Sequence, residues 1–283
     1  MEGCHFLMMR RIEVIGVEGM PEIRPGDDLA ALFLEALRKE GISLQDYDVV
    51  VFASKVVAKS EGRIVDLSGV KPDAAAEKLA AITGKDPRIV QLILSDAAEI
   101  ICVGEDFILT ETKHGFICAN AGIDESNVEH GKAVLLPEDP QRSAATLRRK
   151  IEAATGKKIA VLLADSCGRP FRIGVAGTCV GFAGMKPTLD RRGEKDRFGK
   201  TARITIVAIA DEICAAANLV MGELQEGIPA VIVRGLRFKL DEEQQSVKTL
   251  FFDKRRDVFR TLACKQHFLA VKNLREGQNT LKS

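Results

Sequence analysis

Residues 159–164 read Ile159-Ala160-Val161-Leu162-Leu163-Ala164, an unbroken apolar run that ends at Asp165-Ser166. A short apolar run bounded by polar residues is typical of a buried strand. The preceding segment opens at Asp139-Pro140, an aspartate cap and first-turn proline that favour a helix, and Gly156 supplies a helix end. The sequence therefore predicts a helix, a strand and a polar segment in succession.

Further strand-like and helical segments lie on both sides of this region. Alternating or β-branched runs predict strands at residues 11–17, 48–53, 99–103, 107–112, 115–118, 133–136, 202–208 and 230–233. Apolar spacing and capping residues predict helices at residues 29–39, 73–83, 87–95 and 211–221. Residues 168–199 are rich in glycine and are expected to form an extended loop. The mixture predicts an α/β protein built on a mixed α+β sheet.

The composition excludes several classes of protein. The chain has 283 residues, of which 46% are hydrophobic and 29% charged, with a formal net charge of +1. A charge near zero argues against binding of nucleic acid through phosphate neutralisation. No apolar run is long enough to span a bilayer, so no membrane partner is expected. Residues 1–260 are expected to form the core, as one domain or two closely joined lobes, and residues 261–283 a C-terminal extension.

The cysteines and histidines show no metal-binding pattern. None of the seven cysteines forms a C-x-x-C pair, and the four histidines lack the spacing of zinc ligands. We therefore expect reduced, mostly buried thiols in a cytoplasmic protein, without a structural zinc site.

Two short polar clusters each follow an apolar run. The first is Asn120–Asn127, which contains Asp124, and the second is Asp165–Arg172. Carboxylate, hydroxyl and amide oxygens are the ligands that hard divalent cations prefer, and the arginines Arg169 and Arg172 suit phosphate or carboxylate groups. Each aspartate taken alone is equally compatible with a local turn or a strand-end cap. Together the clusters favour a metal-phosphate site.

Other charged residues allow a functional and a structural interpretation. Glu223 follows a predicted helix, where a carboxylate is unfavourable unless a cation lies nearby. Lys55, Lys59 and Arg63 follow the strand at 48–53, either as phosphate contacts or as a solvated charged surface. Neither a Walker A loop nor a G-x-G-x-x-G fingerprint occurs, so neither common phosphate loop holds a nucleotide here.

At these residues the chain resembles the coenzyme F420-0:L-glutamate ligase family. The resemblance covers nearly everything from Arg11 to about Arg260. Six segments carry it in the family's order: Val17–Ile23, Ser54–Arg63, Asn120–Asn127, Leu135–Pro140, Asp165–Arg172 and Asp211–Glu226. Ser166 stands where a threonine is common in the family, and its hydroxyl can do the same job.

The resemblance implies a GTP-dependent ligase that adds one or more L-glutamate residues, through γ-linkage, to the deazaflavin precursor coenzyme F420-0. It implies an acyl-phosphate intermediate and the release of GDP and phosphate. Mn²⁺ or Mg²⁺ is expected at two sites, with a monovalent cation such as K⁺. A family-specific α/β fold of two intertwined lobes and a homodimer are also implied.

Site residues follow from the same resemblance. The implied metal ligands are Asp124, Asp165, Ser166 and Glu223. The implied catalytic groups are Asp124, Asp165, Arg169 and Arg172. The implied GTP site consists of Met20, Pro21, Glu22, Ile23, Ser54, Lys55, Lys59, Asn127, Met221, Gly222, Glu223, Leu224, Gln225, Glu226, Gly227 and Ile228.

Two other functions remain open on the residues alone. The same clusters would suit a metal-dependent phosphohydrolase, in which water replaces the carboxylate, or a nucleotide or metal sensor without catalytic activity. Phosphate release that depends on glutamate distinguishes the ligase from both.

Overall fold

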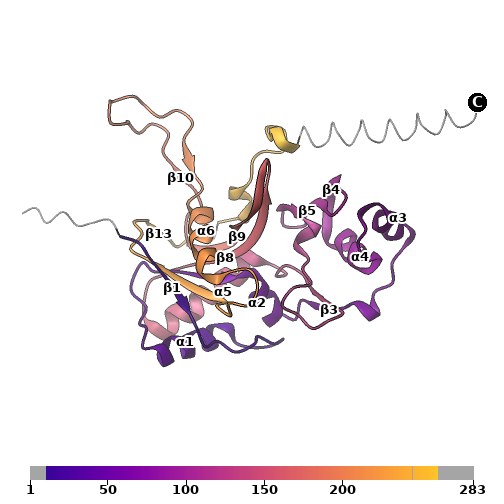
Figure 1. Ribbon diagram of the computed structural model, residues 1–283. Coiled ribbons are helices and arrows are strands. Elements are labelled where there is room, and N and C mark those ends of the chain that lie inside the picture. The colour runs from indigo at the N-terminus through magenta and orange to yellow at the C-terminus, as the bar shows by residue number, and fades with distance from the viewer. Residues whose placement is uncertain (1–10, 244, 261–283) are drawn as a thin grey trace, which may run out of the picture.

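The computed structural model describes residues 11–243 and 245–260. In this part of the chain, a mixed sheet of six strands forms the centre of the molecule, in the order β1-β12-β2-β8-β9-β13 (Figure 1). Strands β2 and β8 run parallel, and the other neighbours run antiparallel. The predicted mixed α/β class is therefore confirmed. The strands are β1 Glu13–Val17, β2 Val49–Ala53, β8 Ala160–Arg169, β9 Arg172–Met185, β12 Ala230–Arg234 and β13 Leu240–Asp241.

Different helices cover the two faces of this sheet. Helices α1 (Leu29–Glu40) and α5 (Pro140–Thr155) pack on one face, and α6 (Ile209–Met221) packs on the other. Successive residues of a strand point to opposite faces, so Val50 belongs to the first core and Val51 to the second. Burial on both faces explains why the sequences of β2, β12 and the first half of β8 are nearly continuous apolar runs.

The predicted helix boundaries are confirmed by their caps. The side chain of Asp139 accepts the N–H of Arg142 at the start of α5, and Gly156 ends the helix with φ at 68°. This left-handed conformation suits glycine. Asp28 and Gly41 play the same two roles for α1. Among the described helices, none is both long and apolar enough to cross a membrane.

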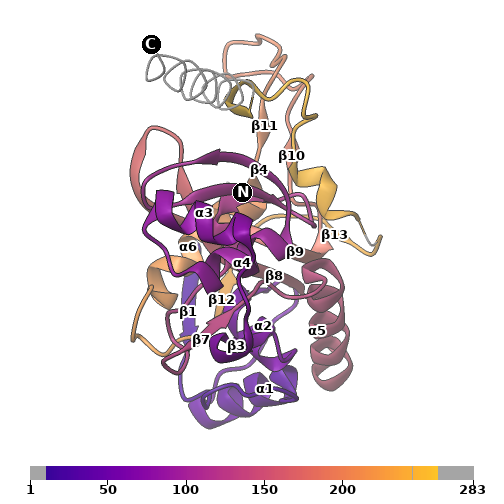
Figure 2. The same cartoon turned by 90° about the vertical axis from the view of Figure 1, so that its right-hand side faces the viewer.

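A third hydrophobic core lies to one side of the central sheet (Figures 1 and 2). Residues of α3 and α4, such as Ala76 and Val90, pack there against Ile108 and Ile123. The predicted strands and helices in this region are confirmed within a few residues, and β3 was not predicted. The division into two lobes stays a prediction, and residues 261–283 lie outside the described part. The elements are β3 Ile64–Asp66, α3 Ala74–Thr83, α4 Pro87–Asp96, β4 Ala97–Val103, β5 Ile108–Thr112, β6 Ile117–Ala119 and β7 Lys132–Val134.

The segment 165–185 differs from the sequence prediction. Strand β8 does not end at Ala164 but continues to Arg169, and β9 occupies residues 172–185 of the expected loop at 168–199. The glycines there have a packing role. A Cβ atom on Gly177 would lie 2.5 Å from the carbonyl oxygen of Cys214 in α6, and one on Gly181 2.5 Å from that of Pro140 in α5. Glycine thus marks close approach of helices to a strand rather than a loop.

Residues 189–207 form a narrow hairpin that extends away from the rest of the chain (Figure 1). Its strands are β10 (Leu189–Asp190) and β11 (Ile206–Val207). The predicted strand at 202–208 is therefore wrong over most of its length. The apolar alternation that suggested it arises from exposed side chains such as Ile204 and Ile206, which pack on no core.

Candidate functional site

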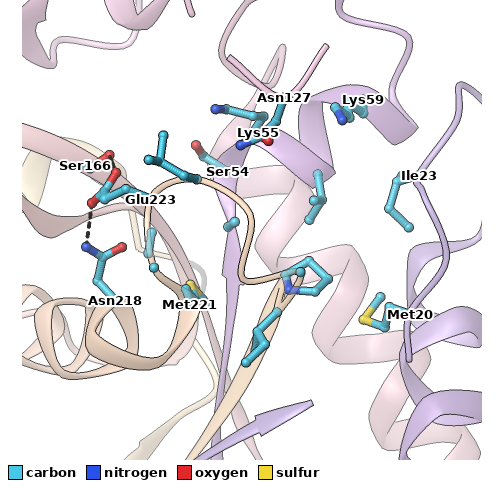
Figure 3. Close-up of a pocket in the computed structure, with 18 of the residues that line it drawn as sticks. Met20, Ile23, Ser54, Lys55, Lys59, Asn127, Ser166, Asn218, Met221 and Glu223 are labelled. Carbon is cyan, nitrogen blue, oxygen red and sulfur yellow. Dashed lines mark hydrogen bonds between the residues drawn. The ribbon is translucent and has the colours of Figure 1, made fainter. Parts of the chain in front are cut away.

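A cleft of about 280 Å³ opens at the carboxyl end of β2, beside the middle of the parallel strand β8 (Figure 3). The register pairs Ala53 with Ala164, so the next residues, Ser54 and Asp165, emerge side by side. Residues 20–23 and the loop 221–229 form the other walls. We call this the β2–β8 cleft. The carboxyl edge of parallel strands is where α/β sheets commonly place their ligands.

A short helix, α2 (Ser54–Ser60), begins directly after β2 and was not predicted. Residues four apart lie on one face of a helix, so Lys55 and Lys59 both reach the cleft wall (Figure 3). Lys59 is only 5% exposed, and its Nζ lies 2.5 Å from Oε1 of Glu22. The cleft therefore contains a buried ammonium group whose partner is an exposed carboxylate.

Most residues of the predicted site line this cleft. Glu226 does not, although its Oε2 accepts the N–H of Leu224 at 2.9 Å and shapes the loop. Asp124 reaches the cleft through Lys55. The predicted residues that line it are Met20, Pro21, Glu22, Ile23, Ser54, Lys55, Lys59, Asn127, Asp165, Ser166, Met221, Gly222, Glu223, Leu224, Gln225, Gly227 and Ile228.

Asp124 is held by an ion pair. Lys55 Nζ lies 2.5 Å from Oδ2 of Asp124 and donates to Oγ of Ser126 at 2.6 Å. Burial raises the pKa of the Asp124 carboxyl group, but hydrogen bonds from Lys55 and from the Ser126 amide outweigh it, and the pKa lies below its ordinary value. Asp124 is thus an anion at neutral pH.

Asp165 has the opposite electrostatic situation. Its Oδ1 accepts a hydrogen bond from Oγ of Ser54 at 2.8 Å. Burial raises its pKa to about 6, and the negative charge of Asp124 contributes to the increase. The hydrogen bond from Ser54 and the positive charge of Lys55 lower the pKa but do not outweigh burial. The two carboxylates therefore lie close enough to influence each other, although they come from distant parts of the sequence. A cation between them would favour the ionised form of both.

A third group lies at the edge of the cleft. Ser166 Oγ donates to Oε2 of Glu223 at 2.9 Å, and Asn218 Nδ2 donates to Oε1 at 2.8 Å (Figure 3). Asn218 was missed in the sequence analysis. It lies one helical turn before Met221 on α6, so the helical spacing back from the loop 221–228 could have found it.

The comparisons with known proteins agree with this geometry. The model of the F420-0:Gamma-glutamyl ligase family matches residues 19–235, which include every residue of the cleft. This chain belongs to that family. The coenzyme F420:L-glutamate ligase of Methanothermobacter thermautotrophicus is 50% identical over 249 residues, which cover 88% of this chain and 99% of that protein. The ligases of the same name from Methanopyrus kandleri and Methanocaldococcus jannaschii are each 45% identical, over 88% and 89% of this chain and 97% and 98% of theirs.

The oxygen donors in this family member fit a divalent cation only in part. Asp124, Asp165, Ser166 and Glu223 offer carboxylate and hydroxyl oxygens, the chemistry that Mg²⁺ and Mn²⁺ prefer. In the described part of the chain, however, no three His, Cys, Asp or Glu side chains gather as a metal site. Mg²⁺ sites with one or two carboxylates usually draw further ligands from water and substrate phosphate. The four metal ligands stay predictions.

Arg169 and Arg172 lie elsewhere in this ligase-family chain. They face each other at the exposed tip of the β8–β9 hairpin and do not line the β2–β8 cleft. Nη2 of Arg169 makes only long contacts, at 3.5 Å and 3.4 Å, with the carbonyl oxygens of Ile173 and Gly174. The structure therefore does not bring them to the acidic groups, and their catalytic role stays a prediction.

Cys167 is no candidate nucleophile in this family member. Burial raises the pKa of its thiol to about 11, and the negative charge of Asp165 adds to the increase. Since the thiolate is the reactive form, the group is inert at neutral pH.

Proposed function

We propose that this protein joins L-glutamate to coenzyme F420-0 and uses GTP to activate the acceptor. The family match and the similarity to known ligases support the ligase activity. The observation that supports the use of a nucleotide is that Lys55, Lys59 and Asp165 line one cleft although they come from two distant segments, with Asp124 paired to Lys55 beside it. That set suits polyphosphate with a divalent cation.

The reaction needs activation because a carboxylate is a poor electrophile. A carboxylate oxygen of F420-0 attacks the γ-phosphorus of GTP, the bond to the β-phosphate oxygen breaks, and GDP leaves. The amine of glutamate then attacks the acyl carbon, phosphate departs and an amide forms, with loss of one proton from the amine. No covalent bond to the protein is required, so the protein acts by positioning and electrostatics.

Each part of the cleft has a role in this proposal. Lys59 and Lys55 neutralise phosphate oxygens, and Lys59 exchanges its partner Glu22 for phosphate. The residues that would hold Mg²⁺ or Mn²⁺ are Asp124, Asp165, Ser166 and Glu223. Bound there, such a cation would supply charge stabilisation for the phosphate oxygens.

Mass spectrometry of F420-0 tests this proposal. The purified protein is incubated with F420-0, GTP, Mn²⁺ and L-glutamate, in parallel with reactions that lack glutamate or contain ATP instead of GTP. We expect a mass gain of one or more glutamyl units and phosphate release only when glutamate is present. Phosphate release without glutamate would indicate a phosphohydrolase, and no turnover of any mixture would indicate a sensor.

A further inference from the structure

A second, larger cavity adjoins the β2–β8 cleft. It has a volume of about 770 Å³ and is bounded by the β5–β6 hairpin, by β8 and β9, and by the segment 248–260. Among the described residues, Asp165 alone lines both cavities. We call it the β6–β9 cavity. Its volume lies in the range of sites that bury small organic molecules.

The apolar part of this cavity is aromatic. The rings of Phe116 and Phe251 form an edge-to-face pair with centroids 5.1 Å apart. Leu250 also lines the cavity, and Ile117 lines it from an exposed position on the edge strand β6. A flat apolar ring system suits such walls, because aromatic surfaces pack in edge-to-face or offset arrangements.

The polar part offers contacts that the described chain does not use. Lys254 and Arg260 are paired with Glu111, but no carboxylate in the described part pairs with Lys248 on the rim. Nε2 of His114 contacts the carbonyl oxygen of Glu138 at 2.7 Å. Its Nδ1 is buried without a hydrogen-bond partner in the same part of the chain. A buried polar atom without a partner is uncommon, and a bound molecule would satisfy it.

Acidic side chains also line the cavity, and they limit where an anion can lie. Asp253 is paired with Arg255. Within residues 11–243 and 245–260, Asp211 accepts only the N–H of Cys179, at 2.9 Å, on the side near Asp165. An anionic group is therefore favoured toward Lys248. A carboxylate of a bound molecule beside Asp165 would be repelled by that aspartate. The positive charge of Lys55, which also acts on Asp165, would reduce this repulsion.

We propose that the β6–β9 cavity binds the acceptor of the ligation, a carboxylic acid with a flat aromatic body and a further anionic group. Its carboxyl group meets the γ-phosphate of the nucleotide at Asp165. This inference rests on the proposed function. Transfer of a phosphoryl group requires the carboxylate within contact of the phosphorus, so the acceptor site must adjoin the nucleotide site. The residue shared by the two cavities marks the junction.

Two substitutions test the inference. Ile117→Trp fills the cavity from a position that is 41% exposed, and Lys248→Glu reverses the unpaired charge. The matched controls are Ile82→Trp, at an exposed isoleucine, and Lys78→Glu, at an exposed lysine; both lie on α3 outside the two cavities. Binding of F420-0 without GTP is measured by calorimetry, and KM is measured separately for F420-0 and GTP. Thermal melting checks folding.

We expect both cavity variants to weaken F420-0 binding by about tenfold or more, because Ile117→Trp fills the space and Lys248→Glu replaces an attractive charge by a repulsive one. The KM for GTP and the two control variants should stay unchanged. An unchanged F420-0 affinity in folded, active variants would overturn the inference, and so would an equal rise in the KM for GTP. Failure of the wild-type protein to ligate any acceptor would instead refute the proposed function itself.

Discussion

Asp124 and Asp165 differ in pKa because only Asp124 has a direct ammonium partner. The Lys55 contact holds the pKa of Asp124 below its ordinary value, whereas burial raises that of Asp165 to about 6. The charge of Asp124 is thus already compensated by Lys55 in the free protein, and a nearby cation would favour the ionised form of Asp165. In the proposed reaction, Lys55 would exchange Asp124 for a phosphate oxygen of the nucleotide.

The isosteric change Asp124→Asn tests the role of this charge. We expect kcat to fall by about two to three decades, the usual cost of removing a charge-stabilising group. Asparagine keeps the size and the acceptor oxygen, so the melting temperature should change little. Steady-state kinetics and thermal melting measure both effects. Ser126→Ala, which removes a neighbouring hydroxyl and no charge, is the control, and full activity of Asp124→Asn would contradict the assignment.

Lys59 is expected to bind the phosphates of the nucleotide. Lys59→Ala should raise the KM for GTP by about tenfold to a hundredfold, because a charge-assisted hydrogen bond contributes about 1.5–3 kcal/mol. Glu22→Gln removes the competing partner of Lys59 and should leave the KM for GTP equal or lower. Initial rates at varied GTP concentration measure both. A higher KM in Glu22→Gln would show that the ion pair itself is needed for binding.

The sequence identified most cleft residues because oxygen-bearing side chains follow apolar strands in it. It could not show which of them meet. Lys55 and Ser126 are hydrogen-bonded although 71 positions apart, and this contact depends on α2, a helix of seven residues that lacks a side-chain cap. The sequence also could not place Arg169 and Arg172, because β8 continues beyond Ala164 and both residues lie at the tip of the β8–β9 hairpin, outside the cleft.

At the scale of elements, the glycines of β9 set how closely the helices approach the sheet. Gly177→Ala would place a Cβ atom 2.5 Å from a backbone oxygen of α6, and backbone cannot move aside as a flexible side chain can. We expect destabilisation of about 1–3 kcal/mol, typical of overpacking. Gly168→Ala, on the neighbouring strand with no atom within 4 Å, should be nearly neutral. Urea denaturation compares the two variants.

This packing role also explains why the glycine-rich segment was mistaken for a loop. A high glycine content is found both where the chain bends and where a helix packs closely against a strand, so it does not distinguish the two. The two cases differ in whether helices pack on the segment, and here α5 and α6, which are distant in sequence, pack on β9. Helices with caps at both ends, such as α1 and α5, needed no such information and were predicted correctly.

The contact between α1 and α5 should depend on pH. Lys150 of α5 donates to Oδ2 of Asp28, the cap of α1, at 2.9 Å. This bond holds the pKa of Asp28 below its ordinary value of 3.8, helped by the amide of Ala31 and opposed by burial. A lowered folded-state pKa gives stability that is present above the unfolded value and is lost as the pH falls through the folded value.

Asp28→Asn isolates the charge, because asparagine is an equally good helix cap. We expect a loss of at most about 1 kcal/mol at pH 7, since exposed ion pairs contribute little, and a smaller loss at pH 3. Asp28→Ala removes the cap as well and should cost about 1 kcal/mol more at both values. Urea denaturation at the two pH values measures this. A cost of Asp28→Asn that is equal at pH 7 and pH 3 would rule out the ion pair as its cause.

At the scale of the whole molecule, two hairpins carry large apolar side chains that pack on no core. Phe171, at the β8–β9 tip, is 90% exposed, and Phe198, on the hairpin 189–207, is 97% exposed. Ile173 and Ile204 are exposed as well. Exposed apolar groups of this size mark contact surfaces. We therefore predict that the protein is a homodimer in which these hairpins contact the second copy.

Sedimentation equilibrium tests the dimer directly. The wild-type protein should have twice the 30.8 kDa mass of one chain, and the double variant Phe171→Ser/Ile173→Ser should dissociate at micromolar concentration. Ile82→Ser, an equally polar change at an exposed isoleucine of α3, should leave the mass unchanged. Both sites are solvent-exposed, so neither change removes core packing, and a lower mass reflects the interface rather than unfolding. A wild-type protein that sediments as a monomer would refute the prediction, and a variant that stays dimeric would place the interface elsewhere.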